Sequence, residues 1–256
     1  MIAHTPGGTE SMPTRRATET EMSTAPVASP RQGVVRVLTG HYGSGKSEVS
    51  VSLAMALAAQ GHKVALGDLD IVNPYFRSRE QADVMTEAGI WVISSSLGHE
   101  STLDLPAVSA EVHLPLGDPA YDVILDAGGN EVGVKVLAEF AADLRRRDAE
   151  VLLVVNAYRP ETVDVAGVLR HLHAIEATSG LAVGGLISNT HVCRETTVAD
   201  VAHGYRLTHE VSRQTGIPIR YVCGLPAALD GLAEHLGEQV DGELLPIGFY
   251  LRAAWM

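Results

Sequence analysis

From residue 34 onward, short runs of β-branched and other apolar residues alternate with longer stretches whose apolar residues recur at helical spacing. The short runs predict seven strands, at residues 34–38, 63–69, 90–93, 121–126, 151–155, 181–188 and 219–222. The longer stretches predict helices at residues 46–60, 78–88, 131–147, 161–178, 195–215 and 227–236. Apolar strands that alternate with helices are typical of βαβ units. We therefore expect an α/β fold in three layers (α/β/α), with a mostly parallel sheet of about seven strands and helices on both faces.

Glycine and proline mark the expected boundaries of these elements. Gly61, Gly89, Gly180 and Gly216 lie where predicted helices should end, a place that favours residues tolerant of left-handed backbone angles. Residues 94–118 have three prolines in or near them, so we expect a loop there. The arginines at 145–147 end a predicted helix, and we expect them to be solvated.

Residues 1–32 differ in composition from the rest of the chain. They are rich in Thr, Ser, Pro, Gly and Glu and carry almost no bulky apolar residue, so they bury too little surface to offset the entropy of ordering. We expect a disordered N-terminal tail at 1–32 and a single domain at 33–256, without internal repeats. Met12 and Met22 are alternative starts to Met1, so part of the tail could be absent from the natural protein.

Composition excludes several classes of protein. An apolar fraction of 46% with 20% charged residues excludes a wholly disordered chain. Two cysteines, Cys193 and Cys223, exclude a disulfide scaffold and suit a reducing cytoplasm. The longest apolar run, residues 53–59, is far shorter than the ~18 residues of a membrane span, so we expect no transmembrane segment. The formal charge of -12 disfavours nonspecific binding of nucleic acid, because the chain would repel the phosphates.

The strongest chemical signal is the sequence Gly-His-Tyr-Gly-Ser-Gly-Lys-Ser at residues 40–47, which fits G-x-x-x-x-G-K-[ST] at every fixed position. It follows the first predicted strand and opens the first predicted helix. Glycines let backbone N–H groups approach phosphate oxygens, and the helix N-terminus adds the positive end of its dipole. The expected phosphate-binding residues are Gly40, His41, Tyr42, Gly43, Ser44, Gly45, Lys46, Ser47 and Glu48.

Acidic residues end two of the predicted strands, at 68–70 and at 126. Ligands of parallel sheets bind at the carboxyl ends of the strands, so these carboxylates should face the phosphates. We expect Ser47, Asp70 and Asp126 to hold Mg²⁺, and Asp70 to orient an attacking water. Gly129 would let its backbone N–H approach the γ-phosphate. Lys46, Asp70 and Asp126 are therefore the expected catalytic residues, with ATP as substrate and Mg²⁺ as cofactor.

These motifs resemble the MinD/ParA/CobQ group of P-loop ATPases, the SIMIBI class, over roughly residues 33–225. The strings at 40–46, 68–80 and 126–130 are similar, more narrowly, to a branch of CobQ/MinD-like ATP-binding proteins. The resemblance implies the P-loop NTPase fold, so that 33–256 is a P-loop nucleotide-binding domain. It also implies that Gly43, Gly45, Lys46 and Ser47 bind phosphate and Mg²⁺, and that Asn189 faces the base.

The sequence departs from the group at one position. The group carries a signature lysine, followed by glycine, that reaches the nucleotide of a partner subunit; this chain has His41 followed by Tyr42. A protonated histidine could imitate the lysine, but the ordinary pKa of histidine, about 6.5, makes it mostly neutral at pH 7. A nucleotide-dependent homodimer therefore stays open.

The residues after Asn189 bear on the choice of base. A guanine site of the G-protein kind has Asn-Lys-x-Asp, whereas Asn189 is followed here by Thr-His-Val without the aspartate. Adenine is therefore favoured, because an asparagine side chain can both donate to and accept from its edge. The turn at 224–226, with Pro226, is expected to wall the base.

Other residues have two interpretations each. Tyr75, Phe76, Arg77 and Arg79 suit a switch loop that orders with nucleotide, or core packing and solvated charge. Arg159 could bind a substrate anion or make a surface salt bridge. His191, Cys193 and Cys223 could form a soft metal site, but buried thiols packed as small apolar groups are favoured. We expect the aromatic C-terminal end, 247–256, to pack against the domain or a partner.

Three functions are consistent with these motifs. The first is a cytoplasmic, Mg²⁺-dependent ATPase that acts as a nucleotide switch, read by an unknown protein partner and reset by in-line attack of water on the γ-phosphate. The alternative is a ligase or phosphoryl-transfer enzyme of the CobQ or dethiobiotin-synthetase type, in which Arg159 and residues 94–118 hold a small-molecule substrate. A weaker alternative is a metal-delivery ATPase that uses its two cysteines.

Overall fold

The computed structural model describes residues 1–2, 32–69, 79–93 and 104–251. Contacts divide the chain into two units, Met1–Pro30 and Arg31–Met256. Nearly all of the first unit lies outside the described residues, so the disordered tail stays a prediction. The second unit is described below.

A parallel sheet forms the centre of this unit. Its described strands are β1 (Val35–Thr39), β2 (Lys63–Asp68), β3 (Trp91–Ile93), β4 (Tyr121–Asp126), β5 (Glu150–Val155), β6 (Val183–Ser188), β7 (Ile219–Gly224) and β8 (Glu243–Pro246). Their spatial order is β3-β2-β4-β1-β5-β6-β7-β8, and every pairing is parallel. The expected α/β fold with a parallel sheet is confirmed, with eight described strands where about seven were expected.

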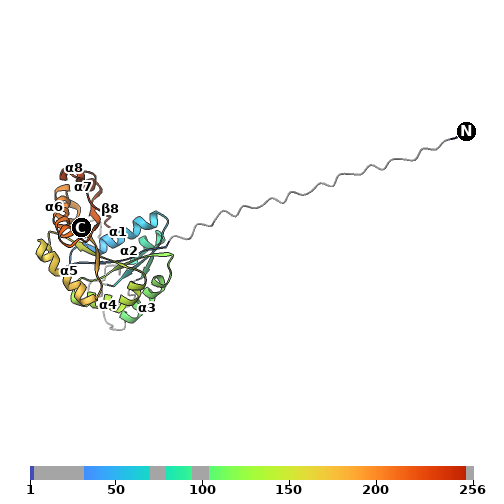
Figure 1. Ribbon diagram of the computed structural model, residues 1–256, viewed down its shortest axis with the longest axis horizontal. Helices are drawn as coiled ribbons and strands as arrows, with labels where there is room; N and C mark the ends of the chain where they lie inside the picture. The colour runs from blue at the N-terminus through green and yellow to red at the C-terminus, as the bar shows by residue number, and fades with distance from the viewer. Residues whose placement is uncertain (3–31, 70–78, 94–103, 252–256) are drawn as a thin grey trace. The chain divides into compact units, whose positions relative to one another are not determined.

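Helices cover both faces of the sheet (Figure 1). The helical segments are α1 (Lys46–Ala59), α2 (Arg79–Glu87), α3 (Asp104–Gly117), α4 (Glu131–Arg146), η1 (Pro160–Thr162), α5 (Val165–Ser179), η2 (Cys193–Glu195), α6 (Val198–Thr215), α7 (Pro226–Asp230) and α8 (Leu232–Leu236). One core cluster joins the sheet to α3, α4 and α5, and a second joins the opposite face to α1. A third packs β7 against α6, α7 and α8.

The predicted loop at 94–118 is wrong over its second half, which forms α3. The prolines misled the prediction. Pro106 lies in the first turn of the helix, where a missing backbone N–H costs no hydrogen bond, and Pro115 lies in the last turn, two residues before the helix ends. Val112 and Leu116 lie one turn apart and are buried in the core against the sheet. The first half of the segment, 94–103, lies outside the described residues.

Glycines end the helices as the sequence predicts. Gly61, Gly89, Gly180 and Gly216 have φ angles of 82°, 80°, 65° and 74°, in the left-handed region. Three predicted helices differ in extent, however. The helix expected at 195–215 begins only at Val198, after the short η2. The helix expected at 161–178 begins only at Val165, after the short η1, and the one expected at 227–236 is divided by Gly231 into α7 and α8.

Arg145 and Arg146 are exposed as expected, but Arg147, which follows α4, is half-buried and holds the amino edge of the sheet. Its guanidinium donates to five carbonyl oxygens, those of Pro115, Leu116, Asp118, Gly33 and Tyr121, at 2.7–3.4 Å. These carbonyl oxygens lie at the end of α3 and at the starts of β1 and β4. A single side chain therefore joins three elements, so the expectation of a solvated arginine is wrong for Arg147 alone.

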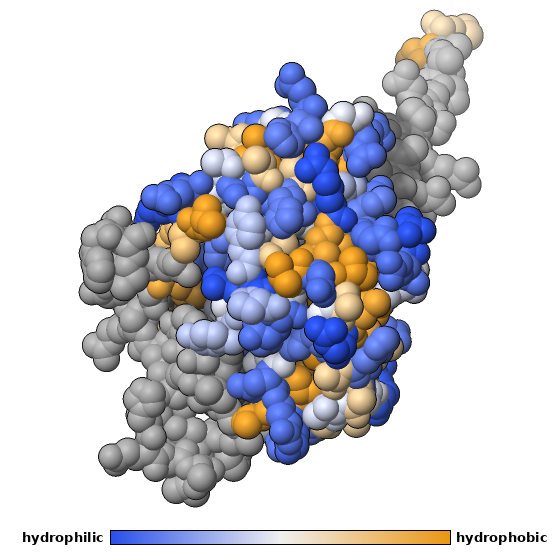
Figure 2. Space-filling model, turned by 90° about the vertical axis from the view of Figure 1, so that its left-hand side faces the viewer, coloured by the Kyte–Doolittle hydropathy of each residue, from blue (hydrophilic) through white to orange (hydrophobic). Residues whose placement is uncertain are grey.

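Apolar side chains also reach the surface. On the face in Figure 2 they form patches broken up by polar side chains. Within the part of the chain that the structure describes, no helix is both long and apolar enough to cross a lipid bilayer.

Candidate functional site

The loop at 40–47 connects β1 to α1 at the carboxyl edge of the sheet. Gly43 and Gly45 have φ angles of 74° and 86°, which residues with a Cβ rarely adopt. A Cβ at Gly45 would also lie 2.4 Å from Nδ2 of Asn189. Lys46 and Ser47 open α1 and are each only 6% exposed. The glycines of the motif are therefore required by backbone angle and by close packing.

Two side chains from distant elements hold the backbone of this loop. Nε of Arg159 donates to the carbonyl oxygen of Gly43 at 2.7 Å, and Nδ2 of Asn189 donates to that of Ser44 at 2.8 Å. Arg159 follows β5 and Asn189 follows β6. Both bonds use loop carbonyls, so they fix the loop without consuming its N–H groups, the donors that would face a phosphate.

Two buried carboxylates lie beside this loop, at the ends of neighbouring strands. Asp126 ends β4 and is fully buried; Asp68 ends β2 and is 7% exposed. The two are register partners, and Asp126 is also paired with Leu38 of β1. The turn after Asp126 touches the loop, since a Cβ at Gly129 would lie 2.0 Å from the carbonyl oxygen of Gly40. The structure thus brings together the loop, Asp126 and Gly129, as expected from the sequence.

Asp70 and the predicted switch residues Tyr75, Phe76 and Arg77 lie outside the described residues. Their roles stay predictions. Asp68, which was expected to face the phosphates but was not assigned to the Mg²⁺ site, takes the buried position next to Asp126. Its signal was available, because it ends the same predicted strand.

The oxygen donors at this edge suit Mg²⁺. Carboxylates and hydroxyls are hard ligands, and Asp68, Asp126 and Ser47 offer them next to the phosphate loop. Within the described residues, no group of three or more His, Cys, Asp or Glu could hold a metal ion.

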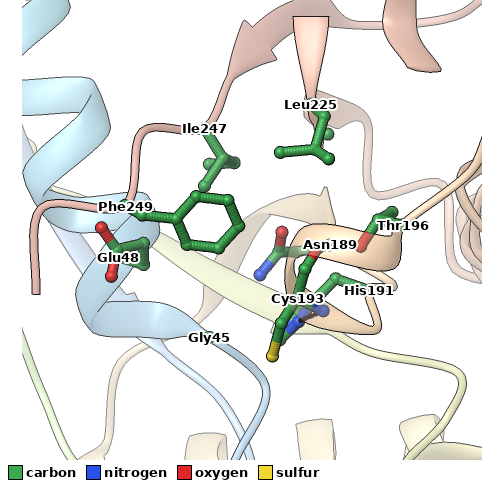
Figure 3. Close-up of a pocket in the computed structure, with 10 residues that line it drawn as sticks. Gly45, Glu48, Asn189, His191, Cys193, Thr196, Leu225, Ile247 and Phe249 are labelled. Atoms are coloured by element: carbon green, nitrogen blue, oxygen red, sulfur yellow. Dashed lines mark hydrogen bonds between the residues drawn. The ribbon is translucent and has the colours of Figure 1, made fainter. Parts of the chain in front are cut away.

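A pocket continues from the loop on the side of Gly45 (Figure 3). Its lining residues are Gly45, Glu48, Asn189, His191, Cys193, Thr196, Gly224, Leu225, Ile247 and Phe249. Asn189, Gly224 and Leu225 therefore lie at one pocket, whereas Pro226, which was expected to wall the base, does not line it. Leu225 is the residue of the 224–226 turn that projects into the pocket, and Pro226 begins α7 with an exposed side chain.

Residues 247–251, here called the C-terminal strap, form one wall of this pocket. Glu48 accepts hydrogen bonds from the backbone N–H groups of Tyr250 and Leu251. Ile247, Tyr250 and Leu251 pack against the core cluster around α1. The expectation that the C-terminal end packs against the domain is confirmed for the strap, while residues 252–256 lie outside the described part.

His41 contacts residues of its own chain. Its Nδ1 lies 3.4 Å from Oε2 of Glu161, and its ring lies 5.6 Å from that of His171 in an edge-on arrangement. Burial lowers the pKa of His171 to about 4, and the nearby charges of His41 and Lys46 add to the effect. His171 is therefore neutral at pH 7. The role of His41 across a dimer stays open.

The cysteines do not form the soft metal site that was kept as an alternative. Cys223 is buried, and burial raises the pKa of its thiol far above the ordinary range. Cys193 is half-buried and lines the pocket beside His191. These residues belong to no metal-holding group in the described parts of the chain.

The fold and the loop together define a P-loop nucleotide-binding protein. A family model described as CbiA, the CobQ/CobB/MinD/ParA nucleotide binding domain, matches residues 37–204. The chain belongs to this family, as the resemblance in its sequence implied.

Curated relatives share part of the chain. It is 25% identical over 217 residues to the cytosolic Fe-S cluster assembly factor nubp2 of Xenopus tropicalis. This match covers 73% of this chain and 77% of the relative. It is 44% identical over 64 residues to a Nubp2 homolog of Drosophila virilis and 40% identical over 77 residues to CFD1 of Yarrowia lipolytica. The shorter matches cover 24% and 27% of this chain and only 24% and 26% of the length of those relatives.

Solved structures share the fold. Chloroplast FtsY from Physcomitrella patens matches with a TM-score of 0.52 and 19% identity, over 74% of this chain and 58% of that one. FtsY from Elizabethkingia anophelis, in complex with GDP, matches with a TM-score of 0.51 and 20% identity, over 84% and 67%. At such identities the likeness concerns the fold alone.

Proposed function

We propose that this protein binds Mg²⁺-ATP and hydrolyses it as a nucleotide switch. The observation that carries the proposal is the contact between the Gly40 carbonyl and Gly129, which joins the phosphate loop to the turn after the buried Asp126. A phosphate chain on the loop would then lie next to a carboxylate that can hold its cation. Membership of the nucleotide-binding family supports the same conclusion.

Each group has a role in this proposal. The loop N–H groups and the ammonium of Lys46 bind the phosphate oxygens. Ser47, Asp68 and Asp126 hold Mg²⁺ or its water ligands, and the cation, when bound, neutralises charge that develops on the γ-phosphate. Asp70 would orient the attacking water, as the sequence predicts.

The pocket beside Gly45 is proposed as the site of the base. Leu225, Ile247 and Phe249 supply apolar surface, and the polar groups of Glu48 and Asn189 lie at its edge. Pockets for small ligands combine these features. Adenine remains the favoured base, because the sequence after Asn189 lacks the aspartate that a guanine site of the G-protein kind requires.

No observation favours the ligase alternative: Arg159, its proposed anion-binding residue, uses its Nε to hold the loop carbonyl of Gly43. The relatives are named as Fe-S cluster assembly factors. Iron–sulfur clusters are held by thiolates. With Cys223 buried, each chain offers at most one accessible thiol, Cys193, so cluster assembly is not our first choice. We expect the switch to act in the cytoplasm, and a nucleotide-dependent homodimer stays a proposal.

Titration of ATP with Mg²⁺ into the wild-type protein and Lys46→Ala, followed by calorimetry, tests the proposal. We expect tight binding by the wild type and none measurable in the variant, because Lys46 is the charge that meets the phosphates. Lys135→Ala is the matched control, since Lys135 lies on the exposed face of α4 and pairs with Glu131. Tight binding by Lys46→Ala would refute the site.

Phosphate release distinguishes the switch from the ligase. The switch hydrolyses ATP without any added small molecule, whereas a ligase or phosphoryl-transfer enzyme needs its acceptor. A rate that depends wholly on an added carboxylate or alcohol would favour the second candidate.

A further inference from the structure

We infer that Phe249 of the C-terminal strap is a base-binding residue of the nucleotide site, the aromatic ring on which the base stacks. The inference rests on the proposed function and adds to it a residue outside the matched family region, which ends at 204. No motif in the sequence marks Phe249.

The position of the pocket supports this role. Gly45 belongs both to the phosphate loop and to the pocket wall, so the pocket begins where the phosphate site ends. Asn189 and His191 contact Gly45 so closely that a Cβ there would lie 2.4 Å and 2.9 Å from their nitrogens. A nucleotide whose phosphates lie on the loop would therefore extend past Gly45 towards the strap.

The chemistry of the walls suits a flat aromatic ligand. Figure 3 shows the Phe249 ring between Glu48 and Asn189, with Ile247 and Leu225 on the same side of the pocket. Phe249 is the phenyl ring of that lining, which also holds the imidazole of His191. A base has a π-face whatever its hydrogen-bonding groups, and stacking on an aromatic side chain binds it.

The ring is held in place before any ligand arrives. The guanidinium of Arg194, on η2, lies over it at 4.6 Å from the ring centroid, a cation–π distance. A ring that is already oriented loses little side-chain entropy when a base binds.

The strap itself is anchored on the helix that carries the phosphate site. Besides the bonds of Glu48 to Tyr250 and Leu251, the N–H of Gly248 donates to Oγ of Ser52 at 3.2 Å, and the N–H of Ile247 donates to the Gly224 carbonyl at 2.9 Å. Glu48 follows Ser47 directly in α1. The distance from the phosphate loop to Phe249 is thus fixed through Glu48, which acts as a positioning residue.

The test compares ATP with sodium tripolyphosphate, which has the phosphates but no base. Dissociation constants are measured with Mg²⁺ for the wild type, Phe249→Ala and Phe249→Trp. We expect Phe249→Ala to weaken ATP about tenfold, as for the loss of one stacked base, and to leave tripolyphosphate unchanged. Phe249→Trp should restore ATP binding. Leu244→Ala, at an exposed residue of β8, is the control for damage to the nearby edge strand.

Two results would overturn the inference: unchanged ATP binding by Phe249→Ala, or an equal loss for ATP and tripolyphosphate. If the wild type binds neither ligand, the proposed function itself fails, which is a different outcome. Glu48→Ala adds a second measurement. If Glu48 acts by holding the strap, the double variant Glu48→Ala/Phe249→Ala binds ATP no more weakly than Glu48→Ala alone; additive losses would contradict this coupling.

Discussion

The side-chain amide of Asn189 donates a hydrogen bond of 2.8 Å to the main-chain carbonyl of Ser44, across 145 positions of sequence. Both residues are buried. The sequence alone predicts a role for Asn189 only at the base. The structure shows that it also fixes the phosphate loop, so that one residue joins the loop to the pocket beside it.

Asn189→Ala leaves the buried Ser44 carbonyl without this donor. We expect a loss of about 1–2 kcal/mol in the free energy of unfolding and a 3- to 10-fold weaker ATP complex. Urea unfolding and calorimetry measure the two effects. Gln214→Ala, at an exposed amide on α6, should change neither quantity. Wild-type stability and affinity in Asn189→Ala would show that the bond does not organise the loop.

Asp126→Asn keeps the shape of a fully buried side chain and removes its charge. If Asp126 helps to hold the cation, Mg²⁺ should strengthen ATP binding much less in the variant than in the wild type. In excess EDTA the variant should bind ATP at least as well, because a negative charge near the phosphates is gone. Asp241→Asn, with its exposed side chain, is the control. The same Mg²⁺ dependence in both proteins would remove Asp126 from the cation site.

Arg147→Ala removes a guanidinium that satisfies five carbonyl oxygens at the amino edge of the sheet. We expect a loss of about 3 kcal/mol in the free energy of unfolding, since hydrogen bonds from charged donors to part-buried groups are the stronger ones. Arg146→Ala should lower the free energy of unfolding by less than about 0.5 kcal/mol, because the Arg146 side chain that pairs with Asp143 is exposed to solvent. ATP affinity should stay unchanged in both, as the phosphate loop lies at the opposite edge. A loss of ATP affinity in Arg147→Ala would contradict the purely structural role.

His171 makes folding dependent on pH. Its pKa is about 4 in the folded protein, chiefly through burial, against about 6.5 in an unfolded chain. Between these values the unfolded chain binds a proton that the folded protein does not. The contribution of His171 to the free energy of unfolding is therefore highest above pH 6.5 and decreases as the pH falls from 6.5 towards 4. The shift corresponds to at most about 3 kcal/mol.

His171→Gln should therefore flatten the dependence of unfolding free energy on pH between 7 and 5, measured by urea denaturation. His173→Gln, on the exposed side of the same helix, should leave the wild-type slope. An unchanged slope in His171→Gln would show that this side chain is not protonated on unfolding in that range.

The alternation of apolar runs and helical stretches was enough to predict a parallel α/β sheet, because buried parallel strands are apolar along their whole length. The edge strand β8 escaped prediction for the corresponding reason. In Glu243–Pro246 only Leu245 is buried, so the run has no continuous apolar signal. Its existence depends on pairing with β7.

The sequence by itself determined the phosphate loop, since the backbone angles of Gly43 and Gly45 and the place of Lys46 at a helix start are local properties. It also placed Asp126 at the carboxyl edge, because a strand end is a local feature. Only the tertiary structure decided what surrounds these residues: Arg159 and Asn189 on the loop carbonyls, and the strap that brings Phe249 to the pocket. Those contacts join positions more than a hundred residues apart, and no local pattern specifies which distant side chain fills a given space.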